Sequence, residues 1–122
     1  ISCKLEKGSE GLYIEITDDI VLTIPEEKKA ALFKNVNKTI ILGIRPEHIS
    51  ENKQKHSLKI NAKLNIVEPL GMETMVYFSI NNSQVCGKVL PNQSIQNGKT
   101  ITLYFDSLKF YFIDPETDLV LR

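Results

Sequence analysis

Few residues in this chain have the type and spacing that catalysis or metal binding requires. The two histidines, His48 and His56, stand eight positions apart, and this spacing matches no pair of metal ligands on one helix. Cys3 and Cys86 form no Cys-x-x-Cys motif and are too few for a disulfide scaffold, although one bridge between them stays open. No serine lies in a nucleophile motif, and there is no glycine-rich phosphate-binding loop. We therefore expect a non-catalytic chain that holds no cofactor and no metal.

Arg45 is the residue for which the sequence suggests a charge near the core. It follows the apolar run 40–44, and Pro46 restricts its backbone to an extended conformation. A half-buried guanidinium needs a carboxylate partner. The candidate partners are Glu47, Glu68, Glu73 and Asp106. We expect Arg45 to tie the end of its strand to the bend at Pro69–Gly71.

The strongest periodic signal in the chain has period two, which is typical of half-buried strands. Apolar and polar residues alternate over 58–66, and a second alternation over 72–80 places Met72 on the core face. Asn81-Asn82 is a pair suited to a tight hairpin, and a third strand follows over 83–90. We expect these three strands to form a meander.

The remaining elements are short strands and one helix. Further strands are predicted at 12–16, 20–24, 39–44, 101–105, 108–112 and 119–121, with a turn at Asp18-Asp19 and a loop at 50–57. Pro25 followed by two glutamates is a helix start signal and predicts a helix over about 26–34. The fold class expected is all-β: a small OB-like Greek-key barrel with additional strands from both ends and one short helix. We expect a single domain over residues 1–122.

The charge balance restricts the partners. The 122 residues carry 15 Lys and Arg against 15 Asp and Glu, which gives a formal net charge of zero. Nucleic-acid binding depends on neutralising phosphates with positive charge, and an anionic membrane surface attracts basic clusters. We therefore expect neither as a direct partner. The chain starts at Ile1 rather than Met, so we expect it to be a piece of a longer protein.

Some strand positions that alternation directs outward are not polar. Met75 and Tyr77 alternate with the core face of their strand. Tyr111 and Ile113 lie opposite Phe110 and Phe112, which we assign to the core rather than to base stacking. Met and Tyr are enriched at interfaces. We expect these outward residues to contribute to a two-fold interface between copies of the chain.

Three ordered motifs carry a resemblance to a known family. Gly43–His48 resembles the Gly-Ile-Arg-Pro-Glu-His signature in the C-terminal region of the ATP-binding subunits of ABC importers for carbohydrates and sn-glycerol 3-phosphate. Val67–Thr74 is similar to a second stretch of that family, and Leu103–Leu121 resembles its terminal stretch with Asp-Pro-Glu-Thr. The residues that carry the motifs are Gly43, Arg45, Pro46, Glu47, Glu68, Gly71, Glu73, Asp106, Asp114 and Pro115. The chain departs from the family at Phe110-Tyr111, Ile113 and Asp118. Residues 1–38 resemble only the family's variable, strand-rich entry, with a turn at Gly8–Gly11.

The resemblance implies an OB-like, TOBE-type regulatory and dimerisation domain. It would follow a nucleotide-binding domain that is absent from this sequence and that would hold ATP and Mg²⁺. The expected partners are a second copy, the chain's own nucleotide-binding domain, the importer's membrane subunits through that domain, and a cytosolic regulatory protein. The expected location is the cytoplasmic face of the inner membrane, as a peripheral protein.

Two other function classes stay open at this point. One is a small-ligand module of the oxyanion-binding kind, which needs clustered hydroxyls, lysines and backbone donors. Thr74 and Ser79 do not make a convincing set of this kind. The other is a nucleic-acid-binding OB domain, which the charge balance disfavours.

Overall fold

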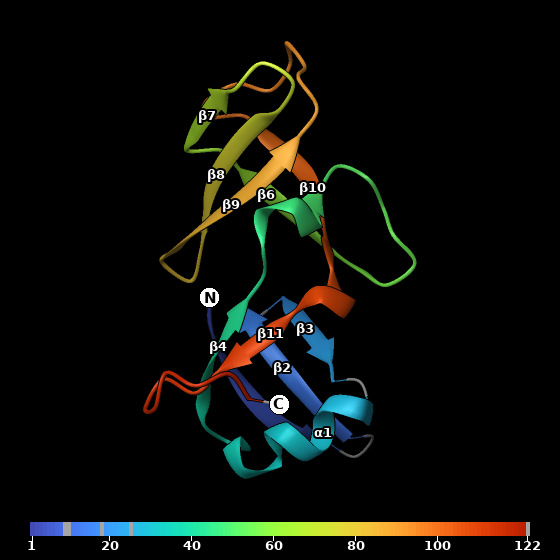
Figure 1. Cartoon of the computed structure of the whole chain (residues 1–122), viewed down its shortest axis with the longest axis vertical. Helices are drawn as coiled ribbons and strands as arrows, with labels where there is room; N and C mark the ends of the chain where they lie inside the picture. Colours follow the sequence, from blue (N-terminus) through green and yellow to red (C-terminus); the bar gives the residue numbers. More distant parts are fainter. Residues whose placement is uncertain (9–10, 18, 25, 122) are drawn as a thin grey trace. The chain divides into compact units, whose positions relative to one another are not determined.

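The computed structural model describes residues 1–8, 11–17, 19–24 and 26–121. The chain divides into two compact units (Figure 1). The first unit consists of Ile1–Gly43 and Tyr111–Arg122, and the second is the continuous segment Ile44–Phe110. The first unit therefore draws on both ends of the chain. The expectation that 1–122 acts as a single domain stays a prediction.

The first unit is built on a five-stranded antiparallel sheet of order β11-β4-β1-β2-β3. Its strands are β1 (Ser2–Gly8), β2 (Gly11–Thr17), β3 (Ile20–Thr23), β4 (Thr39–Gly43) and β11 (Tyr111–Ile113). Side chains alternate between the two faces, so that every second residue of β2 is buried. Cys3, Leu5 and Ile40 are buried in the neighbouring strands. The shared apolar face forms the core of this unit.

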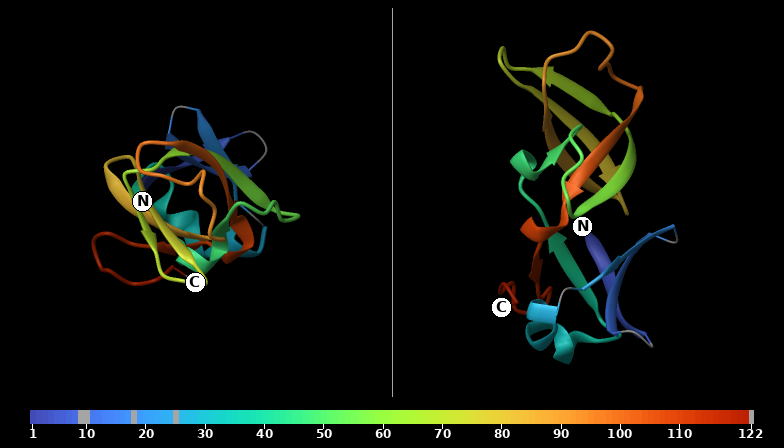
Figure 2. Two further views of the ribbon diagram at one scale, coloured as in Figure 1. Left: turned by 90° about the horizontal axis from the view of Figure 1, so that it is seen from above. Right: turned by 90° about the vertical axis from the view of Figure 1, so that its right-hand side faces the viewer.

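A short helix covers this core. Helix α1 (Glu26–Leu32) continues into a 3-10 turn, η1 (Phe33–Asn35), on one side of the sheet (Figure 2). Leu32 is fully buried, and Lys28 Nζ lies 5.7 Å from the centroid of the Phe112 ring. The predicted helix over about 26–34 is confirmed. Its start signal at Pro25 and the side chains of the two following glutamates lie outside the described part of the chain.

The second unit contains two three-stranded antiparallel sheets, of order β5-β10-β6 and β7-β8-β9. Their strands are β5 (Ile49–Ser50), β6 (Ser57–Lys63), β7 (Ile66–Pro69), β8 (Thr74–Ile80), β9 (Ser83–Val89) and β10 (Thr100–Asp106), with 3-10 turns η2 (Pro46–His48) and η3 (Ser107–Lys109). The predicted hairpin turn between β8 and β9 is confirmed, because Asn81 and Asn82 have φ values of 51° and 64°. Positive φ at both central residues matches the twist of a two-residue hairpin.

The two sheets of this unit share one stretch of backbone. The Leu64 N–H donates to the Lys99 carbonyl at 2.8 Å, and the Leu64 carbonyl accepts from the Gly98 N–H at 2.7 Å. The next residue, Asn65, donates its N–H to the carbonyl of Tyr77 in β8 at 2.7 Å. The chain thus leaves the first sheet and enters the second within two residues.

Aromatic residues pack where the two sheets face each other. The ring centroids of Phe78 in β8 and Phe105 in β10 are 6.1 Å apart, and Phe110 meets Phe105 edge-on at 6.5 Å. Each of the three rings is at most 2% exposed. Ile49 packs against β9 so closely that a Cβ on Gly87 would lie 2.8 Å from Ile49 Cγ2. The core assignment of Phe110 is therefore confirmed.

The prediction of an all-β, OB-like fold with one short helix is confirmed, but the predicted meander is wrong in its first member. Strand β6 pairs with β10, and the meander is β7-β8-β9. Because the chain changes sheets at Leu64 and Asn65, Ile66 faces outward and is 51% exposed. Met72 is not in the core: it lies in the β7–β8 turn and is 90% exposed.

Three smaller predictions also need correction. Leu108 is 54% exposed because it lies in the turn η3 rather than in a strand over 108–112. The expected last strand at 119–121 is reduced to one bridge between Ile113 and Val120. Strand β1 was not predicted. The expected turns at Gly8–Gly11 and Asp18-Asp19 include Ser9, Glu10 and Asp18, and these three residues lie outside the described part of the chain.

Replacing Phe105 by alanine tests the packing between the sheets. Phe105→Ala is expected to lower the free energy of unfolding by roughly 3–5 kcal/mol, because it removes a buried ring and leaves a cavity. Phe33, which is 64% exposed, provides the control. Phe33→Ala should change stability by less than about 0.5 kcal/mol. Urea unfolding followed by circular dichroism measures both, and equal losses would contradict the assignment.

The pH dependence of stability tests the burial of Cys3. Its thiol donates to the Ile40 carbonyl at 3.5 Å, and burial raises the pKa of Cys3 from 9.0 to about 11. The unfolded chain therefore releases this proton first as pH rises, so stability should fall between pH 9.0 and about 11. In Cys3→Ala this part of the fall should disappear. Identical pH profiles of the two proteins in urea titrations would refute the prediction.

Candidate functional site

The first motif begins at a glycine that another side chain covers. Gly43, the last residue of β4, stands directly opposite Tyr111 of β11. The Tyr111 ring lies so close to Gly43 that a Cβ on residue 43 would overlap the ring atoms. An aromatic side chain that packs across a strand glycine in this way compensates for the missing side chain. Tyr111, predicted as an outward residue, is 36% exposed and uses part of its ring to cover Gly43.

The rest of the first motif forms a compact turn. Pro46 opens the 3-10 turn η2 and leaves Arg45 extended, with ψ at 147°. The His48 N–H donates to the Arg45 carbonyl at 2.9 Å, and the Ile49 N–H donates to Pro46. Proline is suited to this first turn position because it has no backbone N–H, and the N–H of another residue would find no partner within the turn. The motif leads the chain from β4 into β5.

The expected role of Arg45 is wrong. Arg45 is exposed rather than half-buried, and it forms no ion pair with a carboxylate in the described residues. Two of the four candidate partners are engaged elsewhere. Glu73 Oε2 lies 3.6 Å from Lys88 Nζ, and Asp106 Oδ1 accepts the Leu108 N–H at 3.2 Å as the cap of η3. Glu47 and Glu68 are exposed. A polar residue after an apolar strand indicates where the strand ends, but it does not indicate whether that polar residue is buried.

The second motif is a tight turn between β7 and β8. The Leu70 N–H donates to the Glu73 carbonyl at 2.8 Å, and Gly71 has φ of 90°. This left-handed conformation is unfavourable for residues other than glycine. Thr74, directly after the turn, is 4% exposed. The motif therefore fixes the register of β7 against β8.

One face of the β7-β8-β9 sheet points away from the core and carries both apolar and charged residues. We call this face the outer face. Its residues are Ile66, Glu68, Met75, Tyr77, Cys86 and Lys88. Glu68, Met75 and Lys88 form one row across the three strands, and Ile66, Tyr77 and Cys86 form the next. The prediction that Met75 and Tyr77 point away from the core is confirmed, because both are partly exposed while Val76 is fully buried.

The two cysteines of the chain are free thiols, one in each unit. Burial raises the pKa of the Cys86 thiol, and the negative charge of an ionised Cys86 raises the pKa of Tyr77. Both groups are therefore protonated at neutral pH. Cys86 therefore contributes a neutral thiol to the outer face.

The tail motif closes a loop beside β11. The Asp114 N–H donates to the Leu119 carbonyl at 3.0 Å, and Asp114 Oδ1 accepts the Glu116 N–H at 2.9 Å. Pro115 is exposed within this loop. Ile113, predicted as outward, is partly exposed and bridges to Val120. Tyr111 and Ile113 belong to the first unit, whereas Met75 and Tyr77 belong to the second.

Two features were missed from the sequence. Lys88 and Glu68 flank Met75, but this became visible only when strand register was known. Asn35 is buried at 8% exposure, and no periodic pattern distinguished it from its polar neighbours. Within the described residues, no cluster of His, Cys, Asp and Glu could hold a metal ion, and no helix has the length and apolar character to cross a bilayer.

Comparison with known families matches both parts of the chain. The family model described as "MalK OB fold domain" matches residues 1–49, and the one described as "TOBE domain" matches residues 42–111. The second match nearly coincides with the unit Ile44–Phe110. The first match covers Ile1–Gly43, which is the N-terminal segment of the first unit.

Curated relatives are ATP-binding proteins of ABC transporters. The chain is 35% identical over 109 residues to the "Uncharacterized ABC transporter ATP-binding protein YcjV" of Escherichia coli O157:H7, covering 88% of this chain and 30% of the relative. It is 33% identical over 120 residues to the "Oligosaccharides import ATP-binding protein MsmX" of Bacillus subtilis, covering 88% and 33%. It is 31% identical over 119 residues to the "Multiple sugar-binding transport ATP-binding protein MsmK" of Streptococcus mutans, covering 94% and 30%. The chain thus spans about a third of the length of these relatives.

The contact between Gly43 and Tyr111 yields a double-mutant prediction. Gly43→Ala is expected to destabilise the chain by about 2 kcal/mol, because the added methyl group overlaps the ring and overpacking costs roughly 1–3 kcal/mol. In a Tyr111→Ala background the same change should cost less than about 0.5 kcal/mol, which would give a coupling energy above about 1 kcal/mol. Additive effects in urea unfolding would contradict this contact.

The exposure of Arg45 yields a second prediction. Arg45→Ala should change the free energy of unfolding by less than about 0.5 kcal/mol, because no partner is left with an unpaired charge. Arg45→Lys, which keeps the positive charge, is the control. A loss above about 2 kcal/mol for alanine alone would show that a buried ion pair exists after all.

Proposed function

Since this chain belongs to the TOBE domain family, we propose that it is the C-terminal regulatory part of the ATP-binding subunit of an ABC importer. The observation that carries the proposal is the order of the two family matches, an OB-fold segment followed directly by the TOBE segment. Their boundary lies at the division between the two structural units. The importer would transport a carbohydrate or sn-glycerol 3-phosphate. The names of MsmX and MsmK refer to oligosaccharides and to multiple sugars, which supports a carbohydrate as the transported substrate.

The chain itself would act without catalysing a reaction. ATP and Mg²⁺ would bind in a nucleotide-binding domain that precedes Ile1, and hydrolysis there would drive import. The chain would contact that domain, and through it the membrane subunits, at the cytoplasmic face of the membrane. It would also be a docking surface for a cytosolic regulatory protein. The coding sequence upstream of Ile1 tests this directly: a phosphate-binding loop of the Gly-x-x-x-x-Gly-Lys-Ser/Thr type is expected there. Its absence would overturn the proposal.

Self-association of the chain would use the outer face. In the row Glu68–Met75–Lys88, an acidic and a basic residue stand on opposite sides of a methionine. A two-fold axis through Met75 would bring Glu68 of one copy opposite Lys88 of the other. Two-fold interfaces require such self-complementary surfaces, and Met and Tyr are enriched in interface cores. Lys88 also lies near Glu73 within its own chain, which holds its ammonium group in place.

Sedimentation velocity at increasing protein concentration tests this interface. The chain should shift from monomer to dimer, and Met75→Lys should weaken association more than tenfold, because it adds positive charge and removes apolar contact area. The matched control is Val21→Lys on β3, which removes another exposed apolar side chain, 51% exposed. This control should leave association unchanged.

Two outcomes would refute the interface. The first is a strict monomer at several hundred micromolar, because a stable contact of about 1,000 Å² should associate in that range. The second is a dimer that Met75→Lys leaves intact, which would locate the contact elsewhere.

A further inference from the structure

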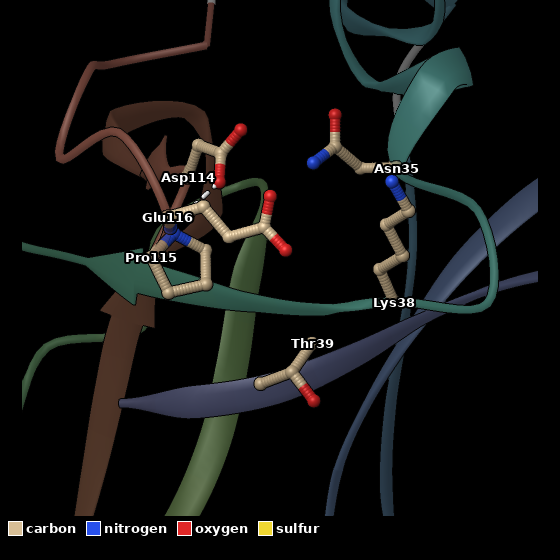
Figure 3. A pocket seen from close by; sticks show the side chains of 6 residues that line it. All are labelled: Asn35, Lys38, Thr39, Asp114, Pro115 and Glu116. Carbon is tan, nitrogen blue, oxygen red and sulfur yellow. Dashed lines mark hydrogen bonds between the residues drawn. The ribbon is translucent and has the colours of Figure 1, made fainter.

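A cavity of about 320 Å³ lies in the first unit between the tail loop and the segment that precedes β4. Asn35, Lys38 and Thr39 form one side, and Asp114, Pro115 and Glu116 form the other (Figure 3). The antiparallel pairing of β11 with β4 brings these distant segments together. The volume is within the range of small-ligand sites.

The Asn35 side chain gives this cavity a polar group that is free to bind a ligand. Asn35 is 8% exposed, yet its amide forms no hydrogen bond with the residues that the structure describes. No fully buried polar atom of those residues lacks a partner, so the amide must reach solvent, and Figure 3 shows it pointing into the cavity. A ligand that fills the cavity would displace the water at this amide and would have to replace its hydrogen bonds. The amide offers that partner both N–H donors and a carbonyl acceptor.

Both walls of the cavity are held by backbone hydrogen bonds. On one side, the Asn37 N–H donates to the Leu5 carbonyl at 2.7 Å, and the Leu5 N–H donates to the Lys38 carbonyl at 3.1 Å. On the other side, the Asp118 N–H donates to the Asp114 carbonyl at 2.7 Å. The site therefore exists before a ligand arrives, which reduces the entropic cost of binding.

The charges on the two walls are opposite, and they do not neutralise each other directly. Lys38 lies beside Asn35 on one wall, and Glu116 and Asp114 lie on the other (Figure 3). Within the described residues, no ion pair joins Lys38 to either carboxylate. A simple anion would face two carboxylates, and a simple cation would face the lysine. A molecule that carries both charges would satisfy both walls.

The geometry points to a binding site for a small zwitterion with one amine and one carboxylate. Its carboxylate would accept hydrogen bonds from Lys38 Nζ and the Asn35 amide. Its ammonium group would donate to the Glu116 carboxylate, while Asp114 holds the loop in place through the bond that it accepts from the Glu116 N–H. Neutral sugars are less well matched, because no aromatic ring lines the cavity. This site is independent of the importer assignment and of the outer face.

Titration of the ¹⁵N-labelled 122-residue chain by NMR tests the site with defined probes. Glycine and γ-aminobutyrate are the zwitterions, and acetate and methylammonium are the matched half-ligands. At least one zwitterion should shift the side-chain amide signals of Asn35 and the backbone signals of Lys38 and Glu116. The half-ligands should bind at least tenfold more weakly.

Two variants separate binding from folding. Asn35→Ala should raise the Kd of the zwitterion about tenfold, as expected for one lost hydrogen bond, while the melting temperature stays the same or rises. Glu116→Gln keeps the shape of an exposed residue and should also weaken binding about tenfold. Lys34→Ala and Glu47→Gln are the matched controls, because both are exposed and neither lines the cavity.

The remaining outcomes would overturn the proposal. No shift from either zwitterion at about 100 mM would show that the cavity has no such ligand, because a Kd of 1 mM already represents a weak site. Glucose or maltose shifting these signals in place of the zwitterions would assign the cavity to sugars. A loss of stability in Asn35→Ala with unchanged binding would make Asn35 a structural residue.

Discussion

The second unit depends on the two residues at which its backbone changes sheets. Leu64 is hydrogen-bonded to the β10 side and Asn65 to β8, so one continuous stretch of chain closes both sheets around the same aromatic core. This change determines which side chains of β7 face outward, and with them the composition of the outer face. The Glu68–Met75–Lys88 row exists only because β7 joins β8 in this register.

Most strands were predictable because alternation between buried and exposed residues is a local property. Strands β2, β8 and β9 follow it closely. The errors occur where a tertiary hydrogen bond interrupts the local pattern. The alternation over 58–66 continues without a break in sequence, yet the partner strand changes at Leu64. Strand β1 also alternates, with Cys3 and Leu5 buried, but its apolar residues are too few to stand out against its two lysines and one glutamate.

The motif residues could be recognised, but their physical roles could not. Gly43 is constrained by Tyr111, which is far away in sequence and becomes its neighbour only through β4–β11 pairing. The sequence offered four carboxylates for Arg45, and distances in the fold assign Glu73 to Lys88 instead. Asn35 had no signal at all, because an unpaired amide is defined by what surrounds it. Residue types thus indicate which groups are available, and the fold decides which of them meet.

The composition of the first unit from both ends of the chain has a consequence for its synthesis. When a ribosome has produced residues 1–43, β4 can pair with β1 on one side only, because β11, its partner on the other side, has not yet been made. The second unit is continuous and can complete its own contacts first, as domains generally fold in units during synthesis. Until Tyr111–Ile113 emerges, the exposed edge of β4 is open to pairing with other chains. The three-residue strand β11 is therefore what covers this edge of β4 once synthesis is complete.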